Sequence, residues 1–321
     1  MMFRSIPLGC GAYLPSNVIN NDYFSGYMET SNQWISSRSG ILERRFVAEN
    51  ETTSDMATAA AKDALKNAGI SASQVDAIIV ATTTPDNVFP AVATIVQHKI
   101  GATSAFAFDV QAVCSGFIYA LSVADSLIRC GQVKTVLVIG ADAMSRIVDK
   151  NDRSTAVLFA DGAGALVLQG TKENTESGVL STHLFSDGTQ KDLLYVDGGP
   201  GQQKQEGTIK MLGREVFKLA VERLGNAVII ALEANNLKAE DIDWFIPHQA
   251  NIRIINSVSE HFNLPCEKVV ITVHKHGNTS AASIPLALHD AVSDGRVKKN
   301  DLIVFEAIGG GLTWGSALVR W

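Results

Sequence analysis

Two stretches of this chain of 321 residues follow one pattern at positions 167 residues apart. The stretch "ALKNAGISASQVDAIIVA" begins at Ala64, and "ALEANNLKAEDIDWFIPH" begins at Ala231. Each stretch predicts the end of a helix, then a polar connection, then a buried strand. Because a period this long is far beyond that of a solenoid, the repeat predicts a chain built from two duplicated halves.

A second pair of similar stretches follows, at positions 164 residues apart. "CSGFIYALSVADSLIRCGQVK" begins at Cys114, and "NTSAASIPLALHDAVSDGRVK" begins at Asn278. Each predicts a core helix that a glycine ends, Gly131 or Gly295, followed by an apolar strand. Continuous Val/Ile/Leu strands that alternate with helices predict α/β layers with buried sheets. We expect the halves to comprise residues 1–170 and 171–321.

The composition excludes several classes of protein. Hydrophobic residues make up 46% and charged residues 19%, which is typical of a globular chain. The net charge of −6 argues against nucleic-acid binding through the overall field. No apolar run is long enough to cross a membrane, so no membrane partner is expected. The four cysteines form no C-x-x-C pair, which favours a reducing cytoplasm and excludes a disulfide framework.

No metal ion or cofactor is predicted. His274 and His276 alternate as they would in a strand, but no third ligand stands at a suitable spacing. The chain also lacks the glycine patterns of phosphate-binding loops and of dinucleotide-binding folds. Nucleotide hydrolysis and hydride transfer therefore have no support in the sequence.

The repeat brings three chemically useful side chains to the ends of equivalent elements. Cys114 and Asn278 stand at equivalent helix N-termini, and His248 follows a strand equivalent to the one that ends at Ala81. Because ligand sites in α/β folds favour the carboxyl ends of strands, we expect the three to meet at one centre. Cys114 is the candidate nucleophile, since a helix dipole favours its thiolate.

Two reaction types remain open for this set. In a cysteine hydrolase, His248 is the base and Asn278 orients it. In an enzyme that forms carbon–carbon bonds, both donate hydrogen bonds to an oxygen that becomes an enolate. Simple packing of the cysteine and helix capping by "HGNTS" are the structural alternatives. The run "AIGGGLTWG" predicts a hairpin turn whose backbone N–H also serves an oxyanion site.

The whole chain resembles the β-ketoacyl-acyl-carrier-protein synthase III family of the thiolase-like superfamily. The resemblance rests on "SNQWISSRSGILERR" (31–45), "DVQAVCSGF" (109–117), "DRSTAVLFADGAGA" (152–165), "IPHQAN" (246–251), "HGNTS" (276–280) and "GGGLTWGSALVRW" (309–321). It implies an α/β fold of five αβαβα layers, a homodimer, and acyl carrier protein (ACP) and acyl-CoA as partners.

The reaction that this resemblance implies is a decarboxylative condensation. Cys114 takes an acyl group, typically from acetyl-CoA, and His248 and Asn278 stabilise the enolate formed from malonyl-ACP. The products are acetoacetyl-ACP, CoA and CO2. The alternative is a related ketosynthase that uses another acyl-CoA primer or another acceptor in secondary metabolism. A hydrolase would instead release a free acid. A non-catalytic binding module would not need all three of Cys114, His248 and Asn278.

The resemblance also implies roles for other residues. The backbone N–H groups of Cys114 and Gly310 would form the oxyanion hole. An arginine and a tryptophan can stack on the two faces of an adenine. The CoA-binding residues would be Trp34, Arg38 and Arg153 at the adenine, and Met211, Gly213, Ala250 and Asn251 along the pantetheine tunnel.

Two further sets of residues are assigned in the same way. Ile308 and a Phe89 that reaches across the dimer would bound the acyl pocket. Because the carrier protein is acidic, its docking face should be basic, and Lys218 and Arg253 match the family's docking positions. Glu260 and His261 stand where some members have basic residues.

Overall fold

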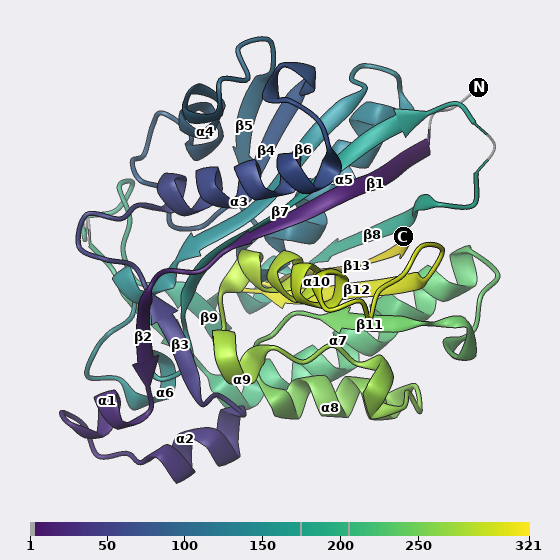
Figure 1. Cartoon of the computed structure of the whole chain (residues 1–321). Coiled ribbons are helices and arrows are strands. Elements are labelled where there is room, and N and C mark those ends of the chain that lie inside the picture. Colours follow the sequence, from purple (N-terminus) through teal and green to yellow (C-terminus); the bar gives the residue numbers. More distant parts are fainter. Residues whose placement is uncertain (1–3, 174, 205) are drawn as a thin grey trace.

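The computed structural model of the chain describes residues 4–173, 175–204 and 206–321. It contains two main sheets, which lie one above the other in Figure 1. The larger sheet has the order β1-β7-β6-β4-β5, with β1 Arg4–Tyr13, β4 Ala77–Ala81, β5 Phe106–Val110, β6 Thr135–Ala143 and β7 Asp161–Thr171. The smaller sheet has the order β11-β12-β13-β8, with β8 Gly178–Ser186, β11 Trp244–Pro247, β12 Leu302–Gly309 and β13 Thr313–Arg320.

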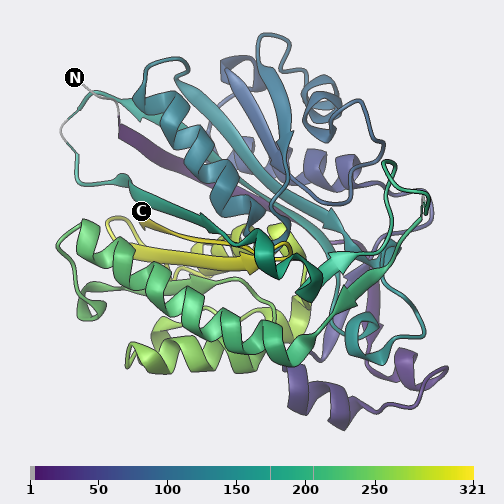
Figure 2. The ribbon, with the colours of Figure 1, turned by 180° about the vertical axis from the view of Figure 1, so that it is seen from behind.

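Three layers of helices separate and cover the sheets. Helices α3 (Thr53–Ala68) and α4 (Val92–Ile100) pack on the outer face of the larger sheet. Helices α5 (Gly116–Arg129) and α10 (Ser283–Ser293) fill the core between the sheets. Helices α7 (Gly213–Ala234) and α8 (Ile252–His261) cover the smaller sheet and lie at the bottom of Figure 1, and α7 is the long green helix of Figure 2. The predicted five-layered α/β fold is confirmed.

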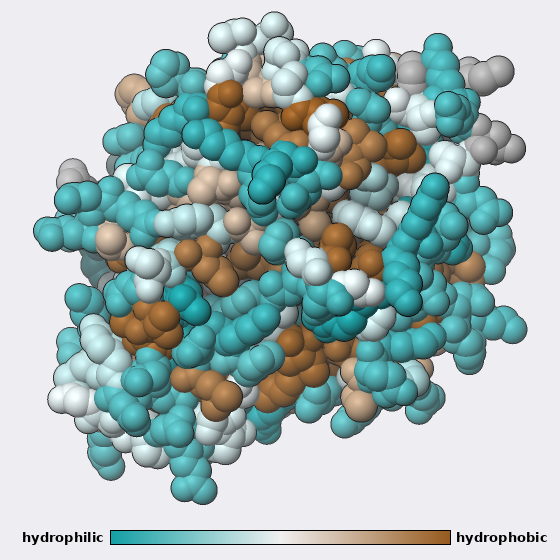
Figure 3. All heavy atoms as spheres, viewed as in Figure 1, coloured by the Kyte–Doolittle hydropathy of each residue, from teal (hydrophilic) through white to brown (hydrophobic). Residues whose placement is uncertain are grey.

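Short elements complete the chain. Two pairs of strands form small separate sheets, β2 Asn17–Asn20 with β3 Glu43–Phe46, and β9 Leu194–Val196 with β10 Ile209–Met211. The short helices are α1 Asp22–Ser25, α2 Asn32–Ser39, α6 Arg153–Ala156 and α9 Val273–His276. Polar side chains cover most of the face that Figure 3 shows.

The two sheets share one topology. Strand β4 runs parallel to β6, and β6 pairs antiparallel with β7; in the same way β11 runs parallel to β12, and β12 pairs antiparallel with β13. The larger sheet continues beyond β4 with β5, whereas β11 has only a parallel bridge from Phe245 to Val269 at that edge. This correspondence is the arrangement that the repeat predicts for a duplicated chain.

The spacing of the second repeat is corrected by the structure. The 3₁₀ turns η2 (Val113–Ser115) and η7 (Ser280–Ala282) lead into α5 and α10, and they start 167 residues apart, not 164. Helix α10 has 11 residues, whereas α5 has 14. Because α10 is shorter, the spacing between the two halves falls to 164 at the glycines that follow these helices, Gly131 and Gly295. Asn278 is therefore not at a helix position equivalent to Cys114; it lies two residues before η7.

Each of these turns packs against a strand of the other half. A Cβ atom at Gly140 of β6 would lie 2.2 Å from the carbonyl oxygen of Ala281 in η7. A Cβ atom at Gly309 of β12 would lie 2.6 Å from the carbonyl oxygen of Ala112, just before η2. Only glycine permits such close contact between backbones. The backbones of the two halves are thus in close contact at the start of the two buried helices.

One sequence expectation about local structure is corrected. His274 and His276 lie in helix α9, so their expected strand alternation is wrong. Within the described residues, no helix is both long enough and apolar enough to cross a membrane.

Candidate active site

Cys114 lies in a strained turn between β5 and α5. Val113 immediately before it has a φ of 49°, a left-handed conformation that β-branched residues rarely adopt. The equivalent residue of the other half, Ser280, has a φ of 52°. Residues in such conformations gather at functional sites, where the surrounding structure holds them. Here Thr313 of the other half accepts a hydrogen bond from Ser115 Oγ and donates one to the Ala112 carbonyl.

The state of the Cys114 thiol differs from the sequence expectation. The side chain is 3% exposed, and burial raises its pKa to about 12. The predicted thiolate, stabilised by the helix dipole, is therefore not the resting form, because loss of hydration opposes the charge more strongly. In the free protein the nucleophile is a neutral thiol.

His248 follows β11 and is held as a neutral hydrogen-bond donor. Burial lowers its pKa to about 3, so the imidazole carries no charge at neutral pH. Its Nδ1 lies 2.6 Å from Ser283 Oγ, which itself accepts the Gln249 N–H. The direction of this hydrogen bond depends on the tautomer of the imidazole: a Ser283 hydroxyl that donates its proton to Nδ1 leaves the ring hydrogen on Nε2. The role of His248 as a donor through Nε2 requires this tautomer.

Asn278 is held in a comparable way. Its backbone forms an isolated bridge with Phe159, two residues before β7, and its side-chain Oδ1 accepts the N–H of Ser280 at 3.0 Å. The acceptor atom of the amide is thus occupied, and Nδ2 has no acceptor among the described residues. His248 Nε2 and Asn278 Nδ2 are two uncharged donors beside one thiol.

Two cavities meet at Cys114. The smaller, of about 150 Å³, is lined by Cys114, His248 and Asn278 together, as predicted. The predicted tunnel residues Met211, Gly213, Ala250 and Asn251 line the same cavity. The larger, of about 390 Å³, is also lined by Cys114 and includes Gly310 in its wall. Cys114 thus contributes to the walls of both cavities, which are called the tunnel (the smaller) and the chamber (the larger) below.

The predicted adenine site lies near the outer end of the tunnel. The guanidinium carbons of Arg38 and Arg153 lie 4.8 Å and 4.5 Å from the ring centroid of Trp34. Asn251 joins this cluster to the tunnel, since its Nδ2 donates to the Arg38 carbonyl at 3.0 Å. Both arginines already contact Trp34, so an adenine that stacks on this ring would replace one of them.

The structure does not bring the two predicted acyl-pocket residues together. Phe89 is 84% exposed and lines neither cavity. Ile308 lines the tunnel-side cavity beside His248 and Asn278, and not the larger chamber. The apolar wall of the chamber comes instead from residues that the sequence reasoning missed, namely Met144, Ile147, Phe159, Leu194, Val196 and Ile209. The alternation of Leu194 and Val196 is the one sequence signal for them.

The predicted docking residues lie at the mouth of the tunnel. Lys218 is exposed on α7, one residue after the tunnel-lining Phe217, and pairs with Glu215 at 3.4 Å. Arg253 is in the first turn of α8, and its guanidinium carbon lies 5.6 Å from the Phe217 ring centroid. Arg253 thus contacts the ring of Phe217, which lines the tunnel, and Lys218 is the next residue along α7.

The candidate metal ligands do not form a site. His276 is buried with its Nε2 3.6 Å from an Asp290 oxygen, whereas His274 is exposed on α9. In the ranges that the structure describes, no group of three or more His, Cys, Asp or Glu is arranged to hold a metal ion.

Comparisons with known proteins agree on one family. Residues 108–188 match the family model of 3-oxoacyl-[acyl-carrier-protein] synthase III, and residues 232–321 match the model of its C-terminal region. Beta-ketoacyl-[acyl-carrier-protein] synthases III from Paramagnetospirillum magneticum and Ehrlichia canis are 58% and 57% identical, over 100% and 99% of this chain and all of theirs. The crystal structure of 3-oxoacyl-[acyl-carrier-protein] synthase III from Aquifex aeolicus is 48% identical, with a TM-score of 0.94, over 99% of this chain and 100% of that one.

The contact between Ser283 and His248 gives a testable prediction. Ser283→Ala removes the hydroxyl that orients the imidazole, and it should slow decarboxylation of a malonyl thioester about tenfold. Acylation of Cys114 should be unchanged, because that step does not use the Nε2 donor. Because the pKa of His248 is lowered to about 3, its imidazole stays uncharged between about pH 8 and about pH 5. The rate of decarboxylation by the wild type should therefore not fall across this range through charging of His248.

Radiolabelled CO2 release and intact-protein mass would measure the two steps separately. An equal loss of both steps in Ser283→Ala would contradict the assigned role. So would a wild-type decarboxylation rate that halves near the usual histidine pKa.

Proposed function

This chain belongs to the 3-oxoacyl-[acyl-carrier-protein] synthase III family, and from that membership we propose how its residues perform the reaction. It is an acyltransferase that initiates fatty acid synthesis, with acyl-CoA and acyl carrier protein as its substrates. The observation that carries the assignment of residues is the shared cavity, whose lining includes Cys114, His248 and Asn278.

The first step transfers an acyl group to Cys114. The Sγ atom attacks the thioester carbonyl of acetyl-CoA, the bond from that carbon to the CoA sulfur breaks, and the thiol proton ends on CoA. The N–H groups of Cys114 and Gly310 stabilise the transient oxyanion. Because the resting thiol is neutral, it requires no cationic partner in the apolar cavity. The acyl chain then occupies the larger chamber.

The second step forms the carbon–carbon bond. Malonyl-ACP enters through the tunnel, its carboxylate leaves as CO2, and the electron pair moves into the thioester as an enolate. His248 Nε2–H and Asn278 Nδ2–H donate to the enolate oxygen. The enolate carbon attacks the acyl-cysteine, and the Cys114 sulfur leaves and regains a proton. These two substrates and one proton from solvent balance the atoms, the charge and the electrons, so the proposal includes no cofactor.

Neutral donors suit this step better than charged ones. A protonated imidazole would attract the malonyl carboxylate and stabilise it against loss of CO2. An uncharged donor instead favours the enolate oxygen, where charge develops in the transition state. The low pKa of His248 also makes it a weak base, which argues against the hydrolase alternative.

The substrates would enter past the cations at the tunnel mouth. Trp34, Arg38 and Arg153 would hold the adenine, and Met211, Gly213, Ala250 and Asn251 would line the pantetheine arm. Lys218 and Arg253 would attract the acidic carrier protein. Location in the cytoplasm is part of the proposal, and the four free cysteines of the described chain support it.

The protein would act as a homodimer. Strand β5 is the free edge of the larger sheet, and its Phe106 is 42% exposed. Nearby in the chain, Val88 is 73% exposed and Phe89 is 84% exposed. An unpaired edge with apolar neighbours is suited to pair with a second copy. In that dimer Phe89 would close the partner's acyl chamber.

Sedimentation velocity should show a dimer for the wild type and a shift to monomer for Phe89→Asp; an unchanged dimer would refute this contact.

The function is tested by the mass of the intact protein after incubation with acetyl-CoA and no carrier protein. Wild type should gain a single acetyl group, and Cys114→Ala should gain none. Cys114→Ala should still release CO2 from malonyl-ACP, because His248 and Asn278 remain. Labelling by a longer or branched acyl-CoA alone would favour the secondary-metabolism alternative, and no labelling at all would contradict the proposal.

The docking surface has its own test. Lys218→Glu combined with Arg253→Glu should raise the KM for malonyl-ACP at least about tenfold, through reversed charge at the tunnel mouth. Acylation by acetyl-CoA should stay within about twofold of wild type, and Lys204→Glu, an exposed lysine paired with Asp197, provides the control. Equal impairment of both substrates would overturn the docking assignment.

A further inference from the structure

The loop from Thr82 to Pro90 contributes to the wall of the acyl chamber. It follows β4, and Thr83 lines the larger cavity beside Gln111 and Cys114. Gln111 Nε2 donates to Thr83 Oγ1 at 3.1 Å. Gln111 precedes the nucleophile by three residues. A displacement of Thr83 would therefore change the chamber where the acyl chain enters it.

A buried carboxylate supports this loop from the inside. Asp142 of β6 accepts the Thr83 N–H at 2.8 Å and the Thr84 hydroxyl at 3.0 Å with one oxygen. Its other oxygen accepts the N–H of Ala281, in the turn that follows Asn278. The start of the loop is thus tied to the half of the protein that supplies the enolate donors.

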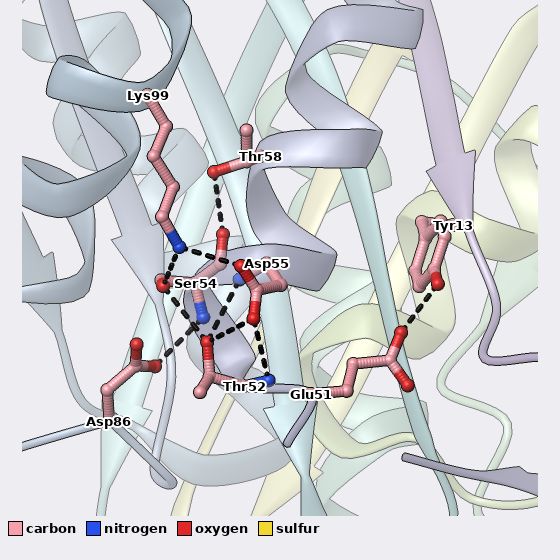
Figure 4. A network of polar contacts seen from close by, with 8 residues as sticks. All are labelled: Tyr13, Glu51, Thr52, Ser54, Asp55, Thr58, Asp86 and Lys99. Atoms are coloured by element: carbon pink, nitrogen blue, oxygen red, sulfur yellow. Dashed lines mark hydrogen bonds and ion pairs between the residues drawn. The ribbon is translucent and has the colours of Figure 1, made fainter. Parts of the chain in front are cut away.

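The N-terminus of α3 supports the same loop from the outside. Thr53 Oγ1 donates to the Thr84 carbonyl at 2.6 Å, and the Ser54 N–H donates to Asp86 Oδ1 at 2.9 Å. Figure 4 shows Asp86 on one side of Ser54 and Lys99 on the other, with the Lys99 ammonium donating to Ser54 Oγ and to Asp55. Asp86 itself lines neither of the two cavities that meet at Cys114.

Beyond Asp86 the loop has no comparable support. Residues 87–90 are all exposed, and the next fixed point is the start of α4, where Asp109 accepts the N–H groups of Val92 and Ala93. Asp86 is therefore the last anchor before the apolar tip that carries Phe89. The direction of the tip depends on this anchor, whereas Thr83, three residues earlier, is also held by Asp142.

We propose that Asp86 is a positioning residue that limits the length of the acyl chain that the enzyme accepts, by holding the segment Thr82–Asp86 between α3 and Asp142. The inference rests on the proposed function, since it takes the larger chamber as the acyl site. Removal of the anchor lets the wall move outward. A longer acyl chain gains room, while the short acetyl group loses contacts with the wall.

The test compares acyl-CoA substrates on matched variants. In Asp86→Ala, the ratio of kcat/KM for hexanoyl-CoA to kcat/KM for acetyl-CoA should rise about fivefold, the equivalent of about 1 kcal/mol for one hydrogen bond. Asp86→Asn should restore the wild-type ratio, because an amide oxygen accepts the Ser54 N–H equally well. Asp294→Ala is the control, since Asp294 also accepts a backbone N–H but at the far end of α10.

The outcomes separate this inference from the proposed function. An unchanged ratio in Asp86→Ala, or the same altered ratio in Asp86→Asn, overturns the inference. If Asp86→Ala does not fold, Thr53→Val removes the neighbouring contact to Thr84 and should raise the ratio in the same direction. A wild type that neither acyl-CoA acylates contradicts the proposed function itself.

Discussion

The close contact of each helix start with a strand of the opposite half is the constraint on which the rest of the structure depends. Gly140 and Gly309 let the backbones of η7 and η2 approach without a side chain between them. This contact places Cys114 of one half beside Asn278 and His248 of the other. Any residue larger than glycine would separate the halves at the point where their functional groups meet. The contact between the two halves is therefore also the means by which the site is assembled.

Burial at this junction decides the charge state of each group. It raises the pKa of the thiol to about 12 and lowers the pKa of the imidazole to about 3, so neither is charged at neutral pH. A buried ion pair between them would need compensation for the loss of hydration of both charges. Neutral groups avoid that cost, and the site works through oriented hydrogen-bond donors. The orientation comes from Ser283 for the imidazole and from the Ser280 N–H for the amide.

Individual residues show where the sequence was sufficient. Gly131 and Gly295, predicted to end the two core helices, have φ values of 75° and 80°, as a helix-ending glycine requires. Met211 and Asn251, assigned through the family resemblance, line the tunnel with the three candidate catalytic residues. His274 and His276 show the opposite case, because a short alternation cannot distinguish a strand from one helical turn. Phe89 lines neither cavity of its own chain, in keeping with a role that was assigned to it across a dimer.

The sequence by itself determined the duplicated α/β organisation, the family, and the identities of the thiol, imidazole and amide, because these depend on local pattern and side-chain chemistry. Only the tertiary structure decided the ionisation of Cys114 and His248, since hydration is lost only when distant segments close over them. It also decided which residues wall the acyl chamber. Leu194 and Ile209 lie far along the chain from Thr83, and only folding brings them to one cavity. The support of that wall by Asp86 and Asp142 is likewise a product of long-range contacts, which no spacing in the sequence reveals.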